Sequence, residues 1–167
     1  MAKRSFVSAG FTPVAVADTA NFTDAGYMGL MGGSTTQRVL IREVMLGGLA
    51  TASAPTPMLL SRDSTVQATP TSLAAPNSDA ALDPASAALA APVVAFVAST
   101  TKPQRAVTLR LLSLGFNAFG GIVYWVAAQG EEPSLLGNTA SLGEVSLSCF
   151  TGGTPGLLSA HIVYEPL

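Results

Sequence analysis

Twenty consecutive residues without a charged side chain, 111–130, constrain this chain more than any other stretch. Their length would suit a membrane-spanning helix. However, the motif GFNAFGG at 115–121 puts glycines at the centre of the stretch, and the flanking residues alternate in the manner of strands. Because glycine readily adopts a positive φ, the chain is expected to reverse there. We therefore predict a hairpin of two strands, 105–114 and 122–127, and no membrane contact.

Strand-like runs recur along the rest of the chain and are separated by turns rich in Gly and Pro. These runs are 37–48, 57–61, 92–99, 142–149 and 158–165. Many short strands with almost no helix predict an all-β fold. The expected architecture is an antiparallel β-sandwich of the jelly-roll type.

The alternation also predicts which side chains share a face of a strand. In the run 37–48, Val39 and Ile41 are expected on the same face as Glu43. In the run 142–149, Val145 and Leu147 share one face and polar residues occupy the other, which is typical of a strand buried on one side only.

The segment 63–92 differs in composition from the strands, because it is rich in Ala and Pro. We interpret it as a long connection within one sandwich domain, 37–167. Asp83 followed by Pro84 is typical of a helix start, so one short helical turn reaching Ala91 is expected inside this connection.

The first part of the chain, 1–36, has no helical periodicity and carries widely spaced aromatic residues. Two interpretations fit this pattern. The segment is either an extended N-terminal arm whose rings dock on a neighbouring subunit, or the first one or two strands of the sandwich. As an arm, it would offer four aromatic anchors: Phe6, Phe11, Phe22 and Tyr27.

The overall composition favours self-association and argues against nucleic-acid binding. Only 11% of the residues are charged, whereas 49% are hydrophobic. A soluble monomer usually carries about a quarter charged residues, so this chain is expected to cover part of its surface with other protein copies. The formal net charge is −2 and no basic cluster is present, so nucleic acid is not an expected partner.

The sequence offers no recognisable chemistry, and we expect no catalytic residue, no cofactor and no metal. Cys149 and His161 are the only residues of their types, which leaves no ordinary zinc site. A hydrolytic triad around His161 would need a nucleophile, but no G-x-S-x-G motif is present. The glycine-rich stretch 32–36 lacks the lysine of a phosphate-binding loop. The protein is therefore not expected to be an enzyme.

Five stretches of this sequence resemble a family of small proteins that are encoded beside capsid genes in tailed bacteriophages. They are QRVLIREVMLGGLATASAPTPMLL (37–60), LDPASAA (82–88), FNAFGGIVYWVA (116–127), GEVSLS (143–148) and HIVYEPL (161–167). The family is similar to jelly-roll or sandwich head proteins of the decoration, or cement, type. The resemblance implies a virion protein on the capsid exterior that binds the major capsid protein, forms a homotrimer and locks neighbouring capsid subunits together.

Within this interpretation, aromatic residues near the tryptophan are expected to anchor the contact, because buried rings carry much of the energy of an interface. The candidates are Phe116, Phe119 and Trp125, in addition to the aromatic residues of the arm. For Phe116 and Trp125, ordinary core packing is the alternative. The alternative function is a phage tail or fibre module that binds host carbohydrate, which exposed Trp and Tyr beside Asn and Asp would favour.

Overall fold

A computed structural model describes nine stretches of the chain: 6–12, 26–32, 35–65, 71–72, 79–81, 94–98, 104–140, 142–149 and 158–167. All regular elements in these stretches are β-strands. The first six are β1 (Phe6–Thr12), β2 (Gly26–Met31), β3 (Arg38–Gly48), β4 (Pro55–Thr65), β5 (Thr71–Ser72) and β6 (Asp79–Ala81). The others are β7 (Val94–Ala98), β8 (Gln104–Asn117), β9 (Ile122–Val126), β10 (Ser134–Leu136), β11 (Glu144–Cys149) and β12 (Leu158–Pro166).

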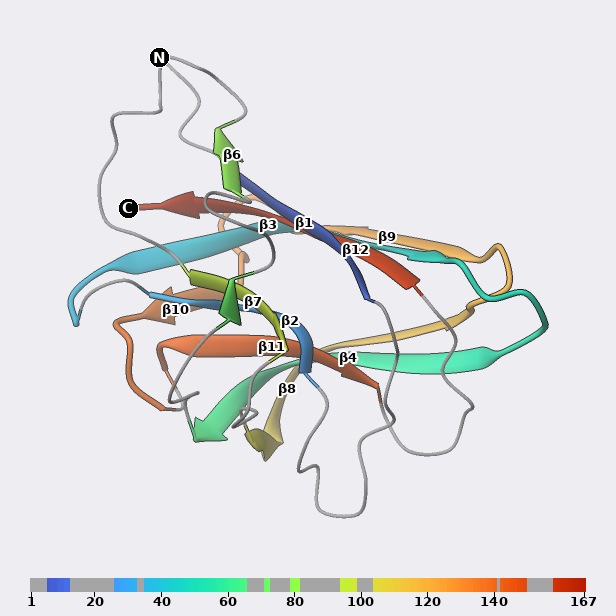
Figure 1. Cartoon of the computed structure of the whole chain (residues 1–167). Coiled ribbons are helices and arrows are strands. Elements are labelled where there is room, and N and C mark those ends of the chain that lie inside the picture. The colour runs from blue at the N-terminus through green and yellow to red at the C-terminus, as the bar shows by residue number, and fades with distance from the viewer. Residues whose placement is uncertain are drawn as a thin grey trace.

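The strands form two sheets that lie one above the other (Figure 1). Sheet A contains β9, β3, β12 and β1 in that order, with β6 beyond β1 and β10 following β9 along the same edge of β3. Sheet B contains β2, β11, β4 and β8, with β7 and β5 beyond β2. Every strand pair is antiparallel. The predicted all-β antiparallel sandwich is therefore confirmed.

The pairing reveals two folded ribbons that each run from one sheet to the other. In the outer ribbon, β1 pairs with β12 in sheet A, and β2 pairs with β11 in sheet B. In the inner ribbon, β3 pairs with β9 in sheet A, and β4 pairs with β8 in sheet B. Two such ribbons, which build two four-stranded sheets, define a jelly roll.

The predicted hairpin of 105–114 and 122–127 is wrong in its pairing, although both strands exist. β8 belongs to sheet B and β9 to sheet A, so the turn between them crosses from one sheet to the other. Each strand instead pairs with a partner about 40 to 80 residues earlier in the chain. Local alternation identifies a strand, but it contains no information about such distant partners.

Within its described residues, the segment 1–36 contains two strands, β1 and β2, and both belong to the sandwich. This agrees with the interpretation that the segment forms the first strands of the sandwich and not a separate arm. β1 lies between β12 and β6, and β2 lies between β11 and β7. Their backbones are therefore part of the sheets and do not form an arm outside them. The helical turn expected at 83–91 lies outside the described residues.

The expected long connection 63–92 starts later than predicted, because β4 continues to Thr65. Asp63 is thus a residue of sheet B. Further along, the short strands β5 and β6 extend the edges of the two sheets.

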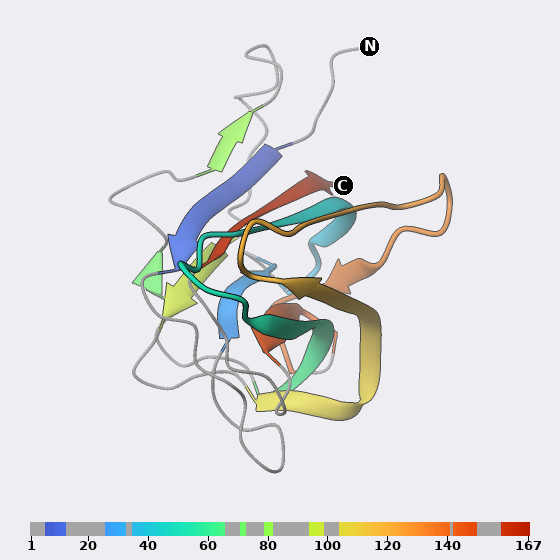
Figure 2. The same ribbon diagram turned by 90° about the vertical axis from the view of Figure 1, so that its right-hand side faces the viewer.

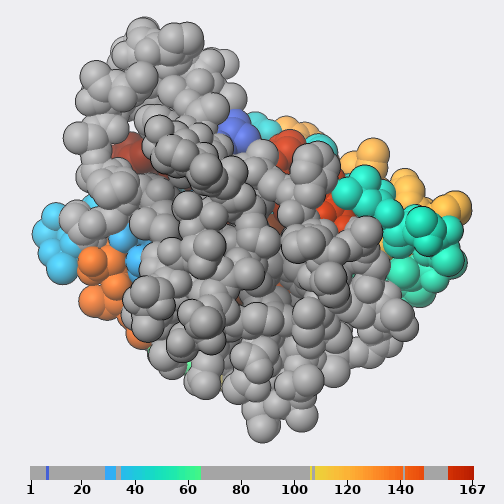
Figure 3. All heavy atoms as spheres, in the orientation of Figure 1, coloured from blue at the N-terminus to red at the C-terminus, as the bar shows by residue number. Residues whose placement is uncertain are grey.

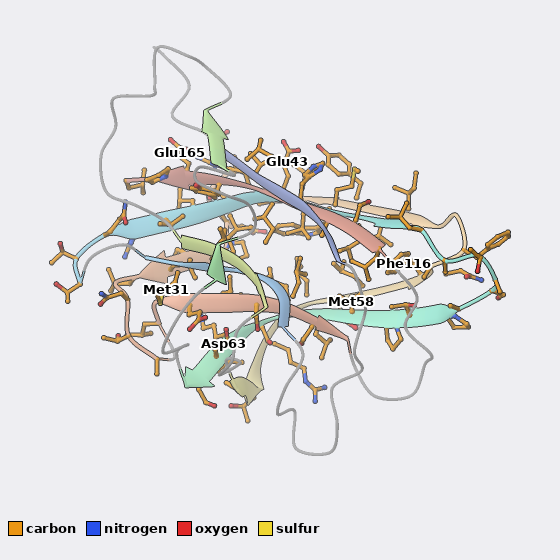
Figure 4. The ribbon with its side chains drawn as sticks, in the orientation of Figure 1. Met31, Glu43, Met58, Asp63, Phe116 and Glu165 are labelled. Atoms are coloured by element: carbon orange, nitrogen blue, oxygen red, sulfur yellow. The ribbon has the colours of Figure 1, made fainter. Side chains whose placement is uncertain are left out.

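A β-bulge in β3 changes the predicted faces of that strand. The register between β3 and β12 shifts between Val163 and Tyr164. Arg42 is therefore an extra residue of β3 that has no directly opposite residue on β12. Before the bulge, Val39 and Ile41 are buried, whereas after it Val44 and Leu46 are buried. Glu43 therefore lies on the outer side of sheet A instead of sharing the face of Ile41 (Figure 4).

The core lies between the sheets and consists of aliphatic side chains from six strands. Its fully buried members are Leu30, Val39, Ile41, Val44, Leu46, Met58, Leu60, Leu135, Val145, Leu147, Leu158 and Ile162. Burying one such side chain contributes about 1.5–3 kcal/mol to folding. Both ribbons contribute to this cluster, so the core joins the two halves of the fold.

Candidate interaction surface

Two sheet crossings of the inner ribbon lie against each other at one end of the sandwich, onto which Figure 2 looks. The crossing 49–54 joins β3 to β4, and the crossing 118–121 joins β8 to β9. Three backbone hydrogen bonds link them: Gly48 N–H to Gly121 O (2.8 Å), Ala50 N–H to Ala118 O (2.9 Å) and Ala118 N–H to Ala54 O (2.8 Å). Together, the two crossings form one hydrogen-bonded unit.

The side chain of Asn117 fixes this unit further. Its Oδ1 accepts hydrogen bonds from the backbone N–H groups of Ala54 and Phe119, each at 2.9 Å. Its Nδ2 donates to the Ser53 hydroxyl at 2.9 Å. The bond to Phe119, two residues on, is the usual way in which Asn stabilises a turn. Asn117 therefore sets the direction in which Phe119 leaves the turn.

Gly48 permits the close approach of the two crossings. A Cβ atom at this position would lie 2.2 Å from the carbonyl oxygen of Ala118, which is backbone and cannot rotate away. Within the turn itself, Gly120 has a φ of 71°, a conformation that other L-residues rarely adopt. Gly48 thus allows the crossings to lie close together, and Gly120 allows the chain to reverse between β8 and β9.

Exposed apolar side chains gather at this end and along β9. We call them the β9 strip: Leu49 (46% exposed), Phe119 (57%), Ile122 (72%), Tyr124 (56%) and Val126 (53%). The last three alternate with Val123 and Trp125, which face inward and are partly buried. In the space-filling view, light-orange and teal segments of this region project at the right-hand end (Figure 3).

The core is incompletely closed along the same side of the molecule. Five partly buried hydrophobic residues pack against the core: Leu111, Leu112, Phe116, Val123 and Trp125. All five belong to β8 and β9, which are the edge strands of the two sheets. Apolar surface of the core is therefore accessible on this side, next to the β9 strip.

Three of the predicted anchor residues belong to β8, β9 and the turn between them, but in different environments. Phe116 and Trp125 pack against the core while staying partly exposed, which agrees with the alternative of core packing. Phe119 is exposed at the turn. For the other four candidates, Phe6, Phe11 and Tyr27 contribute backbone to β1 and β2, whereas their side chains and the whole of Phe22 lie outside the described residues.

Leu49, Ile122, Tyr124 and Val126 were not predicted as surface residues. The sequence shows the alternation of 122–127 but not which face is exposed. The exposed face depends on β9 being an edge strand, which is a property of the sheet. The charge pattern does not reveal the exposed face, because an edge strand normally carries a charged residue, whereas β9 carries none and is compatible with a central strand.

Charged groups border the strip on the outer side of sheet A. The Arg42 Nε donates to Glu165 Oε2 at 3.0 Å, and the same guanidinium also pairs with Glu132. The Tyr124 hydroxyl donates to the Glu43 carboxylate. This hydrogen bond raises the pKa of Tyr124 above its ordinary value, with smaller contributions from desolvation and from the charge of Glu43. Both arrangements fix side chains at the border of the strip.

Sheet B buries polar side chains on β11, so the prediction of a strand buried on one side only is wrong. Glu144, Ser146 and Ser148 are at most 2% exposed, although Val145 and Leu147 occupy the core face. The Ser146 hydroxyl donates to Asp63 Oδ1 on β4 at 2.7 Å. A buried carboxylate needs such donors, because an unpaired charge is costly away from water.

Arg62 connects the two sheets at the end opposite the crossings. Its guanidinium donates to the backbone carbonyls of Ser134 (2.7 Å) and Leu142 (3.2 Å). Burial lowers the pKa of Arg62 relative to an exposed arginine. Because Ser134 begins β10 and Leu142 lies in the loop between β10 and β11, Arg62 ties both ends of this region to β4.

Among the described residues, no group of three or more His, Cys, Asp and Glu side chains is arranged to hold a metal ion. The same part of the chain contains no helix with the length and hydropathy needed to cross a membrane. No family model, curated protein or solved structure matches this chain. The β9 strip and the partly buried residues of β8 and β9 beside it are therefore the most distinctive surface features of the described residues.

Proposed function

We propose that this protein is a structural, non-enzymatic virion protein that binds the outer surface of a bacteriophage capsid and cements neighbouring major capsid subunits. The single observation that carries the proposal is the β9 strip on a jelly roll, an apolar and charge-free surface on a fixed scaffold. The sequence resemblance to phage decoration proteins supplies the identity of the partner. The homotrimer that this resemblance implies is part of the proposal.

The strip has the properties of a contact that forms without rearrangement. Asn117 and the three bonds between the crossings hold the turn before any partner arrives. A surface that is already ordered loses little entropy on binding. Exposed aromatic and aliphatic side chains can then contribute most of the binding energy, with Phe119 as the anchor at the tip.

The carbohydrate-binding alternative receives less support from the described residues. It would be favoured by exposed Trp and Tyr beside polar groups that are free to bind sugar hydroxyls. Instead, Trp125 packs against the core, and both ends of the Asn117 amide are engaged within the crossings. The capsid role is therefore the better supported of the two.

Cryo-EM of virions with and without this protein tests the proposal directly. The expected result is extra density on the capsid exterior at local three-fold positions. Density confined to the tail would overturn the capsid role and favour the tail or fibre alternative.

A binding assay with purified capsid shells tests the part played by the strip. The variant Phe119→Ser removes the exposed ring at the turn, and we expect about a tenfold or larger loss of affinity. Leu142→Ser is the matched control, because Leu142 is 53% exposed and lies in the loop between β10 and β11. Equal affinity of both variants would show that the strip does not contact the capsid. Deletion of 1–36 is unsuitable here, because it would remove β1 and β2 from the sheets.

A further inference from the structure

Within the described part of the chain, the outer edge of β9 presents backbone hydrogen-bonding groups that pair with no other strand, in a regular pattern. Ala127 donates its N–H to Arg42 O at 2.8 Å, and Gly121 accepts from Gly48 N–H at 2.8 Å, both across the β3 side. In an antiparallel strand, successive residues direct their N–H and C=O groups to opposite sides. Residues 121, 123, 125 and 127 therefore face β3, and Ile122, Tyr124 and Val126 direct theirs to the open edge.

This edge lacks the features that normally prevent strands from pairing with another chain. Such features are a charged side chain, a proline or a bulge. The sequence of β9 is IVYWV, and its register with β3 is regular over all five residues. In the described part of the chain, β3 is the strand with which β9 pairs. The edge of sheet A is thus ready to accept an additional strand.

We propose that β9 pairs with β9 of a second copy of this chain, antiparallel and centred on Tyr124, so that sheet A continues across a two-fold axis. Such an isologous contact requires that each residue meets its partner reciprocally. Around Tyr124 this condition holds: Ile122 would lie opposite Val126 of the second copy, and Tyr124 opposite itself. All N–H and C=O groups that the open edge of β9 presents would then be bonded.

The side chains match on both faces of the proposed pair. On the outer face, each pair joins two apolar or aromatic residues, which favours association across strands. On the inner face, the small Val123 would lie opposite the large Trp125 of the second copy, and Trp125 opposite Val123. Each pair thus combines one small and one large side chain, which avoids a steric clash. The strand is therefore complementary to itself in size as well as in hydrogen bonding.

The distribution of charge favours a second copy over a charged partner. The stretch 111–130 contains no charged residue, and Tyr124 already engages Glu43 at its border. A partner with charged residues at this edge would bury them without counter-charges, which is costly. A second copy brings the same uncharged strand and buries no unpaired charge.

The available area predicts a reversible dimer. A standard stable interface buries about 800 Å² on each partner, and a five-residue strand alone supplies only part of that area. Leu109 (38% exposed) and the partly buried Leu111 and Leu112, all on the neighbouring edge strand β8, can add to the contact. The pairing uses the backbone edge of β9, so Leu49 and Phe119 of the β9 strip lie outside the paired residues and remain available to a capsid. It does not depend on binding to a capsid.

Sedimentation velocity of the full chain over a wide concentration range tests this proposal. The expected result is that the mass doubles as the concentration rises, starting from the oligomer present at low concentration. We call this doubling the step. In the double variant Ile122→Lys with Val126→Lys, lysines face each other twice across the axis. Like-charge contact of this kind should weaken the association by about a hundredfold or more, and the step should disappear.

A charge-swapped variant decides whether the pairing is the one proposed. Ile122→Glu with Val126→Lys places opposite charges at both contacts and should restore the step. Leu142→Lys, at an equally exposed position away from β9, should leave it unchanged. An unchanged thermal transition in all variants shows that the fold is intact, because the substituted side chains are exposed. Absence of the step in the wild-type chain, its persistence in the double-lysine variant, or failure of the charge swap to restore it would each overturn the proposal.

Discussion

Strands β9 and β11 show opposite relations between polarity and exposure. β11 buries Glu144 and Ser146 almost completely, whereas β9 exposes Ile122 and Val126 by more than half of their surface. The difference follows from their places in the sheets. β11 lies between β2 and β4 in the middle of sheet B, whereas β9 forms an edge of sheet A. Polarity at these positions therefore indicates what surrounds each strand: side chains of the same chain for β11 and, in our proposals, a protein partner for β9.

The comparison predicts that removing similar side chains from the two strands has very different effects on stability. Leu147→Ala on β11 deletes a fully buried side chain and should cost about 2–5 kcal/mol. Ile122→Ala on β9 should change the free energy of unfolding of the dissociated protein by less than about 0.5 kcal/mol. Denaturant unfolding at low protein concentration measures both. Equal losses would show that β9 is packed within the chain and would remove the contrast.

A second test addresses the scaffold that presents the β9 strip. In Gly48→Ala, the new Cβ would overlap the carbonyl of Ala118, so the two crossings must separate. We expect a loss of about 1–3 kcal/mol, as for other overpacked sites. Gly115→Ala is the control, because nothing lies within 4 Å of the position of its Cβ. A Gly48 variant as stable as the control would mean that the crossings are not held as closely as described.

A third test concerns the polar face of β11. Ser146→Ala removes the hydroxyl that donates to Asp63, and a buried carboxylate that loses a donor should cost about 1–3 kcal/mol. Ser113→Ala on β8 is the matched control at an exposed position and should be near neutral. If thermal unfolding shows no difference between the two variants, the buried hydrogen bond does not contribute to stability.

The smallest expected effect is at the border of the β9 strip. Because the pKa of Tyr124 is raised in the folded chain, its bond to Glu43 stabilises the fold at pH values below the ordinary tyrosine pKa. This contribution is lost as the pH rises through the raised pKa. Ultraviolet titration of the wild-type chain against Tyr124→Phe reports this group, and Glu43→Gln should move its pKa back toward the ordinary value. An unchanged titration in Glu43→Gln would contradict the proposed cause.

Much of the fold was predictable because its strands carry local signals. The runs 142–149 and 158–165 alternate over most of their length, and 37–48 is β-branched in part and ends in paired glycines. These three runs correspond to β11, β12 and β3 of the structure. Composition also favoured an antiparallel sandwich over a helical fold. The bulge at Arg42 was not predictable, because it arises from the register with β12, more than a hundred residues later.

The surface was only partly predictable, and for a related physical reason. Phe119 was named as an aromatic residue near Trp125 that could anchor an interface, and it is exposed at the turn. The exposure of Ile122, however, depends on which strand lies beside β9, and the sequence of β9 alone is compatible with a central strand. The burial of Ser146 likewise reflects its central place in sheet B. The pairing of distant strands thus decides which side chains are exposed when the amino-acid composition of a strand fits both an edge and a central position.

The pairing of β12 with both β1 and β3 has a consequence for how the chain folds during synthesis. β12 contains residues 158–166, so sheet A keeps an open gap between β1 and β3 until these residues have left the ribosome. Contacts between such distant segments also form slowly. Until then, the apolar residues of β3 are without their neighbour, and incomplete chains are prone to aggregate. Slowing translation before residue 158 should therefore lower the soluble yield more than slowing it afterwards.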